Sequence, residues 1–209
     1  MKNTDSILLE HYNKVFKQEP EYIITMLSKP DVAKKDIKTL VYAPNEENNF
    51  WKLCTIGTSD YEMPQREIGL GRKANRRNEY VMFVEPSAEI SYSTNYWLTL
   101  LLVAKYTAHC EKNITVSDTI EFTGGEGELC GAVILMPEVM KKPDIVKCYI
   151  TKKKFISIFQ VMPITRQQLD EKLNRQDGTY WLMEQFYTHD DDYNLISMKP
   201  LANIETPSK

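Results

Sequence analysis

One segment of the chain, residues 96–106, constrains the fold more than any other. It predicts a helix with apolar side chains over nearly its whole circumference, namely Trp97, Leu98, Leu100, Leu101, Leu102, Val103 and Ala104. A surface helix needs only one apolar stripe, so a helix of this kind must be enclosed by other elements. We therefore expect a layered fold in which this helix lies deep against a sheet.

Strand patterns fill the middle of the sequence, and helix patterns lie mainly near its ends. Helices are predicted at residues 8–16, in a short piece at 22–27, at 165–175 after a capping-box sequence, and at 177–187. Strands are predicted at residues 37–42, 50–56, 78–84, 114–122, 129–136, 145–151 and 155–162. This mixture predicts a single α+β domain with a central mixed or mostly antiparallel sheet and flanking helices. We expect the domain to span residues 1–198 and residues 199–209 to form a loose C-terminal tail.

The composition favours a soluble protein of a reducing compartment, and we expect it to be cytoplasmic. The 209 residues carry a formal net charge of −3, which argues against direct nucleic-acid binding. Four cysteines are present, and none is spaced as a CxxC pair. The longest apolar run, residues 97–104, is too short to span a bilayer.

The sequence shows no constellation of catalytic or metal-ligating residues. The three histidines are His11, His109 and His189, and none has ligand spacing with a cysteine. His189 precedes three aspartates, a run that we interpret as a solvated loop after a helix. Ser59 and Asp60 have no histidine near them in sequence. We therefore predict no catalytic residue, no metal and no cofactor.

Two carboxylates have alternative interpretations. Asp60 follows a predicted strand and can accept hydrogen bonds from backbone N–H groups in the turn. Glu79 lies inside an apolar strand, where a carboxylate must face water or pair with a cation. Arg77 is two residues away on the same strand face, so we expect it to be the partner of Glu79.

Residues 64–78 form the most basic loop of the chain. They include Arg66, Arg72, Lys73, Arg76 and Arg77, with Gly69 and Gly71 between them. The loop is able to meet an acidic partner, but a mobile, solvated loop explains the same composition and is slightly favoured.

Five short blocks occur in a fixed order: residues 53–63 (strand and turn), 77–82 (strand), 95–101 (helix), 129–137 (strand) and 158–169 (strand into helix). Together they resemble the suppressor-of-fused-like domain family. The family's proline is absent from the helix block, and Ser117-Asp118-Thr119 stands where the family often has a Gly-His-Thr turn. The residues that match or replace its structural motifs are Gly57, Met63, Arg77, Glu79, Asp118, Cys130, Gly131 and Pro163. Gly131 is expected to allow a bulge or a close approach of backbones, and Cys130 to be a buried structural thiol.

The resemblance implies an α+β domain that acts by binding another protein. Animal members sequester a transcription factor with two lobes, and this chain is long enough for one lobe only. Short relatives of this type are typically bacterial; many are described as immunity proteins that neutralise polymorphic toxins, and others have no assigned role. The resemblance therefore suggests an immunity protein. The mild acidity suits a basic toxin domain as partner. We place the binding surface at Ser59, Asp60, Tyr61, Glu62, Arg72 and Arg76. The alternative is an enzyme or small-ligand-binding protein with its site at the Gly57–Met63 turn.

Overall fold

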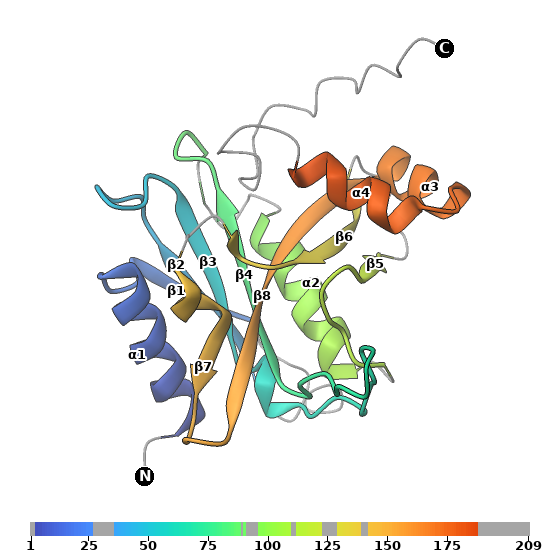
Figure 1. Ribbon diagram of the computed structural model, residues 1–209. Helices are drawn as coiled ribbons and strands as arrows, with labels where there is room; N and C mark the ends of the chain where they lie inside the picture. The colour runs from blue at the N-terminus through green and yellow to red at the C-terminus, as the bar shows by residue number, and fades with distance from the viewer. Residues whose placement is uncertain are drawn as a thin grey trace.

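One twisted sheet of eight strands forms the centre of the molecule (Figure 1). The computed structural model describes residues 3–26, 36–88, 90, 96–109, 112–122, 129–138 and 142–187. The strands follow the order β1-β2-β3-β4-β8-β6-β5, and β7 also pairs with β8. Their bounds are β1 Tyr22–Met26, β2 Ile37–Tyr42, β3 Trp51–Ile56, β4 Asn78–Val84, β5 Thr119–Glu121, β6 Leu129–Leu135, β7 Lys147–Tyr149 and β8 Phe155–Thr165.

The strand pairing is mixed, as the sequence predicts. β4 and β8 run parallel, and all the other pairs are antiparallel. β8 pairs with β4, β6 and β7, so it links the two halves of the sheet. A parallel pair needs a long crossover connection, and the segment between β4 and β8 supplies it with α2 (Tyr96–His109), β5, β6 and β7. The predicted α+β class is confirmed.

Helices cover both faces of the sheet, and two apolar cores lie between them. α1 (Thr4–Phe16) packs on one face through Leu8, Tyr12 and Phe16. α2 (Tyr96–His109) packs on the opposite face through Leu100, Val103 and Ala104. α3 (Arg166–Asn174) and α4 (Gly178–Tyr187) follow β8 at the end of the sheet near β6 (Figure 1).

α2 differs in one respect from the fully enclosed helix that the sequence predicts. Leu100, Val103 and Ala104 are buried, but Lys105 and Tyr106 are exposed. The last two turns therefore have a solvent side, and the helix extends to His109. Burial of Leu100 and its neighbours confirms that the helix packs on the sheet.

Residues 22–26 form the edge strand β1, so the predicted helical piece there is wrong. The β-branched residues Ile23, Ile24 and Thr25 suit a strand, and each pairs with a residue of β2. The predicted strand at 114–122 is real only over Thr119–Glu121, because residues before it form a turn around Asp118. The strand predicted at residues 145–151 is shorter in the structure. It is β7, which follows a 3₁₀ turn, Pro143–Val146.

Cys130 and Gly131 lie in β6 where the register of the β6–β8 pair shifts. A Cβ atom on Gly131 would lie 2.5 Å from the carbonyl oxygen of Ile120 on β5, so only glycine allows this approach. Cys130 is fully buried, and burial raises the pKa of its thiol. Pro163 lies opposite Ala132 in the neighbouring strand β8. His189 and the tail from 199 lie outside the described residues.

Candidate functional site

Glu79 is the buried centre of the candidate site. Its side chain projects from β4 and is fully buried. One carboxylate oxygen, Oε2, accepts a hydrogen bond from the Thr55 hydroxyl at 2.6 Å. The other, Oε1, accepts from the backbone N–H groups of Gly57 at 3.1 Å and Ser59 at 2.9 Å. The carboxylate therefore joins β4 to the turn that follows β3.

The burial of Glu79 also shifts its protonation. Loss of solvent raises the pKa of this carboxyl group to about 7, although the hydrogen bonds from Thr55, Ser59 and Gly57 act in the opposite direction. The group therefore changes charge near neutral pH.

Arg77 is not the partner of Glu79, so that prediction is wrong. The guanidinium donates from Nη1 to the carbonyl oxygen of Ser59 at 2.6 Å, and its Nη2 lies 3.5 Å from Glu62. Arg76 lies 3.1 Å from the other oxygen of Glu62 and donates from Nε to the carbonyl oxygen of Met63 at 2.7 Å. Arg77 precedes β4, so the strand alternation that motivated the pairing does not extend to it. The two arginines instead hold the outer side of the turn.

The Gly57–Met63 turn is held by hydrogen bonds and is only partly exposed. Gly57 has φ 108°, and a Cβ atom there would lie 2.8 Å from the carbonyl oxygen of Asp36. A 3₁₀ turn, Thr58–Asp60, follows it. Ser59 is 1% exposed and so lies beneath the surface where the sequence placed it as a contact residue. Met63 is buried in the core near α2, as its apolar side chain requires.

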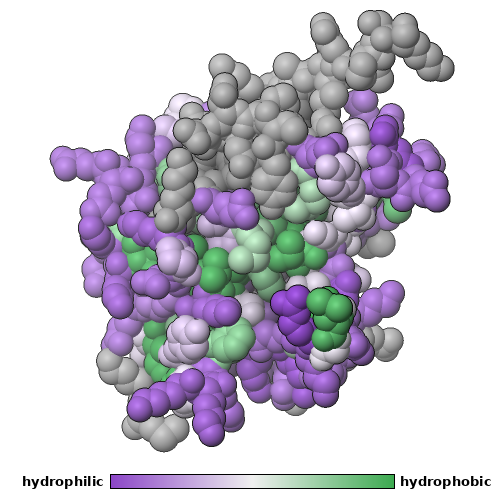
Figure 2. All heavy atoms as spheres, viewed as in Figure 1, coloured by the Kyte–Doolittle hydropathy of each residue, from purple (hydrophilic) through white to green (hydrophobic). Residues whose placement is uncertain are grey.

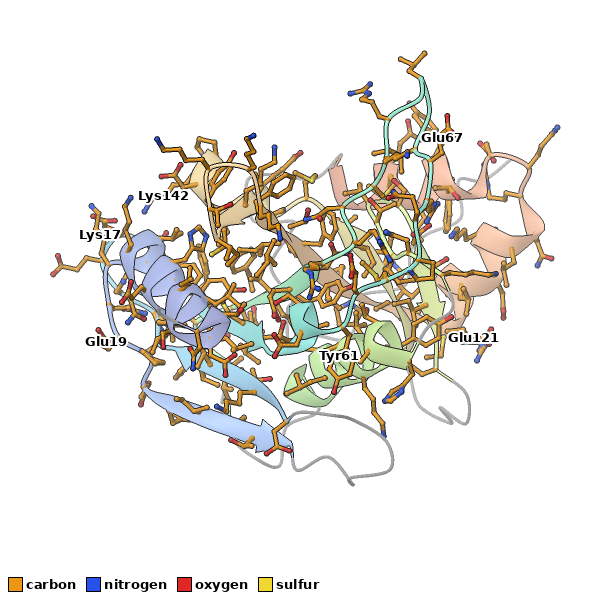
Figure 3. The ribbon with its side chains drawn as sticks, turned by 90° about the horizontal axis from the view of Figure 1, so that it is seen from below. Lys17, Glu19, Tyr61, Glu67, Glu121 and Lys142 are labelled. Atoms are coloured by element: carbon orange, nitrogen blue, oxygen red, sulfur yellow. The ribbon has the colours of Figure 1, made fainter. Side chains whose placement is uncertain are left out.

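The exposed part of the turn consists of Asp60, Tyr61 and Glu62. Asp60 and Glu62 are exposed and Tyr61 is half-buried. The Tyr61 ring lies 6.5 Å from the ring of His109 at the end of α2, measured between centroids. Glu62 forms ion pairs with Arg76 and Arg77, and Tyr61 is labelled in Figure 3.

Residues 66–74 form a hairpin that stands away from the body of the molecule, as the loop bearing Glu67 shows in Figure 3. Ala74 N–H donates to the Arg66 carbonyl at 2.8 Å, and Ile68 N–H donates to the Arg72 carbonyl at 2.9 Å. Glu67 and Lys73 form an isolated antiparallel bridge. The segment is therefore a hydrogen-bonded hairpin, and residues 66–73 are exposed, as a solvated loop would be.

Long-range contacts anchor the base of this hairpin. Asp118 accepts from the backbone N–H of Thr115 at 2.8 Å and from the guanidinium of Arg66 at 2.5 Å. Asn113 donates through Nδ2 to the carbonyl oxygens of Pro64 at 3.1 Å and Asn75 at 2.8 Å. Asp118 thus shapes its own turn and holds a residue far away in sequence.

Three residues of this arrangement were missed at the sequence level. Thr55 was visible as a polar residue in an apolar strand, which is a usable signal for a buried hydrogen-bond partner. The partners of Asn113 lie in other parts of the chain, and so do Phe155 and Ser157, which Asn75 contacts besides its neighbours Arg76 and Arg77.

The described residues give no metal-binding cluster of three or more His, Cys, Asp or Glu side chains. In the same part of the chain, no helix has the length and apolar character needed to cross a membrane. His11 lies on α1 against the sheet, where burial lowers the pKa of its imidazole.

The model of the suppressor of fused protein (SUFU) family matches residues 33–198. The chain belongs to this family. Among solved structures it is similar to a protein described as a SUFU homologue from Neisseria gonorrhoeae, with 16% identity, a TM-score of 0.60, and coverage of 92% of this chain and 95% of that one. A search of curated proteins gave no match.

Two further structures share the fold. A chain of the Sufu–Fu complex is 14% identical with a TM-score of 0.58, covering 93% of this chain and 89% of that one. Drosophila Suppressor of Fused is 15% identical with a TM-score of 0.59. The match covers 91% of this SUFU-family chain but 49% of the Drosophila chain, so this chain spans about half of that relative.

Proposed function

We propose that this SUFU-family chain is a non-enzymatic protein-binding domain, and that its binding surface comprises the exposed residues of the Gly57–Met63 turn and the hairpin at 66–74. The observation that carries the proposal is the anchoring of this surface. Glu79 holds the turn from within, and Arg76 and Arg77 hold Glu62 from outside. A recognition surface fixed before binding loses little conformational entropy when a partner docks.

Family membership supports a protein as the ligand. One structural relative is a chain of a complex between Sufu and Fu, which is a complex of two proteins. On this surface we retain Asp60, Tyr61, Glu62, Arg72 and Arg76 as contact residues and leave out Ser59, because its side chain is buried.

The alternative, an enzyme or small-ligand site at the same turn, has one observation in its favour. A carboxyl group with a pKa of about 7, as in Glu79, suits a general base. Its two oxygens, however, already accept hydrogen bonds from Thr55, Gly57 and Ser59, and the side chain is fully buried. A base must reach the proton that it removes, so this geometry favours a structural role for Glu79.

In the cell, we propose that the partner is a toxin domain and that the chain acts as its immunity protein in the cytoplasm. The resemblance of the sequence blocks to short bacterial members supports this role. Growth of cells that express the captured partner alone and with this chain would test it. We expect the partner to arrest growth and this chain to restore it, and a partner harmless by itself would contradict the toxin role.

The surface itself is tested with the double variant Tyr61→Ala, Glu62→Lys in a pull-down from the source cell. We expect the affinity for the captured partner to fall at least about tenfold, which corresponds to 1.4 kcal/mol. Stability should change little, because the lost Glu62 ion pairs are exposed and contribute about 0–1 kcal/mol.

A matched control is Tyr180→Ala with Glu171→Lys, which changes the same residue types on α3 and α4. It should leave capture unchanged. Full capture by a folded Tyr61/Glu62 double variant would place the interface elsewhere.

A further inference from the structure

Two basic turns lie at the same end of the sheet, and contacts at their bases link them. The first is the hairpin at 66–74, and the second is the turn at 150–154 that joins β7 to β8. Asn75 connects them, since its Nδ2 donates to the carbonyl oxygen of Phe155 at 3.0 Å and to the Ser157 hydroxyl at 3.1 Å. The backbone N–H of Ser157 also donates to the carbonyl oxygen of Arg77 at 3.0 Å. We call the surface formed by residues 57–77 and 147–157 the two-hairpin face.

The two-hairpin face is strongly basic in an acidic protein. Its segments contain nine Lys and Arg residues against three Asp and Glu residues, a net of +6, whereas the whole chain carries −3. The remainder of the chain is therefore at −9. Separation of this size produces a local positive potential that the net charge conceals.

Part of this charge is neutralised internally. Arg66 pairs with Asp118, and Arg76 and Arg77 share Glu62. Within the described residues, no carboxylate lies at ion-pair distance from Arg72 or from any of the three consecutive lysines at 152–154. Lys147 lies over the Phe155 ring, 5.1 Å from its centroid. The unneutralised cations thus lie on both hairpins.

Apolar side chains are exposed among these cations. Leu70 at the tip of the first hairpin is 92% exposed, Ile68 beside it is 49% exposed, and Tyr149 of β7 is 61% exposed. Figure 2 shows a small hydrophobic patch beside strongly hydrophilic side chains where this hairpin projects.

The backbone conformation at the tip of the hairpin is unusual for a leucine such as Leu70. Gly69, Leu70 and Gly71 all have positive φ, 92°, 52° and 70°. A left-handed conformation is unfavourable for residues other than Gly, Asn and Asp, and an exposed leucine gains no free energy from burial. Neither the backbone conformation nor burial in this chain favours leucine at position 70. Contact of the side chain with another molecule would favour it.

We propose that the two-hairpin face binds an acidic segment of a partner protein whose interspersed apolar side chains contact Leu70. The inference rests on the proposed protein-binding function and specifies the chemistry of the partner at this face. It revises the expectation of a basic partner, which used the net charge alone. An apolar anchor within a charged rim is the usual arrangement of a protein interface.

Single-stranded nucleic acid fits this face less well. Such binding uses a series of aromatic rings for base stacking along a basic groove. Among the described aromatic residues of the face, Tyr149 alone is largely exposed, and the projecting tip carries an aliphatic side chain. The negative charge of the remaining chain would also repel a long phosphate backbone.

The test uses fluorescence anisotropy with two probes. One is a fluorescein-labelled peptide in which Asp and Glu pairs alternate with Leu, and the other is a labelled oligo-dT strand. We expect the peptide to bind more tightly than oligo-dT at an ionic strength of about 0.15 M, where exposed charges interact within about 8 Å. Lys152→Glu with Lys153→Glu should weaken peptide binding at least about tenfold.

Two further variants separate charge from apolar contact. Leu70→Asn keeps the charge and suits the left-handed backbone, and it should weaken peptide binding by about tenfold. Lys14→Glu with Lys105→Glu, on exposed positions of α1 and α2, makes the same charge change elsewhere and should leave binding unchanged. Circular dichroism melts establish that each variant is folded.

Each other outcome overturns the inference. Tighter binding of oligo-dT, weakened by the Lys152/Lys153 variant, would make this a nucleic-acid face. Equal weakening by the Lys14/Lys105 variant would show a nonspecific charge effect, and a lack of binding to both probes would exclude an acidic ligand. In all three cases a pull-down with the wild-type chain still reports on protein binding separately.

Discussion

At the residue scale, Glu79 places a carboxyl group in the core, where hydrogen bonds from Thr55, Gly57 and Ser59 offset part of the cost of leaving water. The same bonds determine the position of the turn on which Asp60 and Glu62 lie. One buried side chain thus links the interior of the sheet to the candidate surface.

Glu79 makes stability dependent on pH in a direction opposite to that of most carboxylates. Its pKa is about 7 in the folded protein, against 4.5 as the ordinary value. The folded state therefore holds the proton more tightly, and the contribution is fully present below pH 4.5 and lost as pH rises through 7. At 1.36 kcal/mol per pKa unit, the loss is about 3 kcal/mol.

Glu79→Gln removes this titration. Between pH 5 and pH 8, we expect the free energy of unfolding of the wild type, measured with urea, to fall by about 2.5 kcal/mol more than that of the Glu79→Gln variant. Asp60→Asn, an exposed carboxylate on the same turn, is the control and should keep the wild-type slope. Equal slopes in the Glu79 variant and wild type would show that Glu79 does not titrate in this range.

At the element scale, α2 and the β5–β6 pair show two ways in which packing determines the size of a side chain. α2 buries Leu100 completely, while Lys105 on the same helix is exposed. β6 approaches β5 so closely at Gly131 that a Cβ atom would lie 2.5 Å from a carbonyl oxygen. Packing of α2 requires a large side chain at Leu100, whereas the close approach of β6 to β5 requires that position 131 has no side chain.

Leu100→Ala should destabilise the protein by about 2–5 kcal/mol, because it leaves a cavity between α2 and the sheet. Thermal and urea unfolding measure the change. Lys105→Ala on the exposed side should stay within about 0.5 kcal/mol of wild type. If the two variants melted at the same temperature, α2 would not be packed as described.

Gly131→Ala should destabilise by about 1–3 kcal/mol through the clash with the Ile120 carbonyl. Gly71→Ala is the informative comparison, since its Cβ would meet nothing within 4 Å and only its positive φ carries a cost. We expect urea unfolding to show the larger loss for Gly131. A wild-type stability for Gly131→Ala would mean that β5 moves away freely.

At the scale of the whole molecule, the sheet brings together segments that are distant in sequence. Parallel pairing of β4 with β8 places the turn at 150–154 and the hairpin at 66–74 at the same end of the sheet, where Asn75 contacts Phe155. The two-hairpin face is therefore a product of topology, and so is its net charge of +6 in a chain of −3. The binding tests above belong to this scale, because each variant changes a surface assembled from separate segments.

Local patterns in the sequence determined the α+β class, α1, most strands, the capping box at Thr165, and membership of the family through its blocks. These features depend on periodicity and on residues a few positions apart, which a sequence displays directly. The error at residues 22–26 arose where a short apolar run fits either period, and pairing with β2 decided it.

Only the tertiary structure decided the partners of Glu79 and Arg77, the burial of Ser59, the hairpin at 66–74, and its contact through Asn75 with β8. Each depends on atoms tens of residues apart along the chain. The net charge and the local spacing of residues carry no information about which distant segments come into contact. The fold therefore created a basic, apolar-tipped face that the composition of an acidic chain does not reveal.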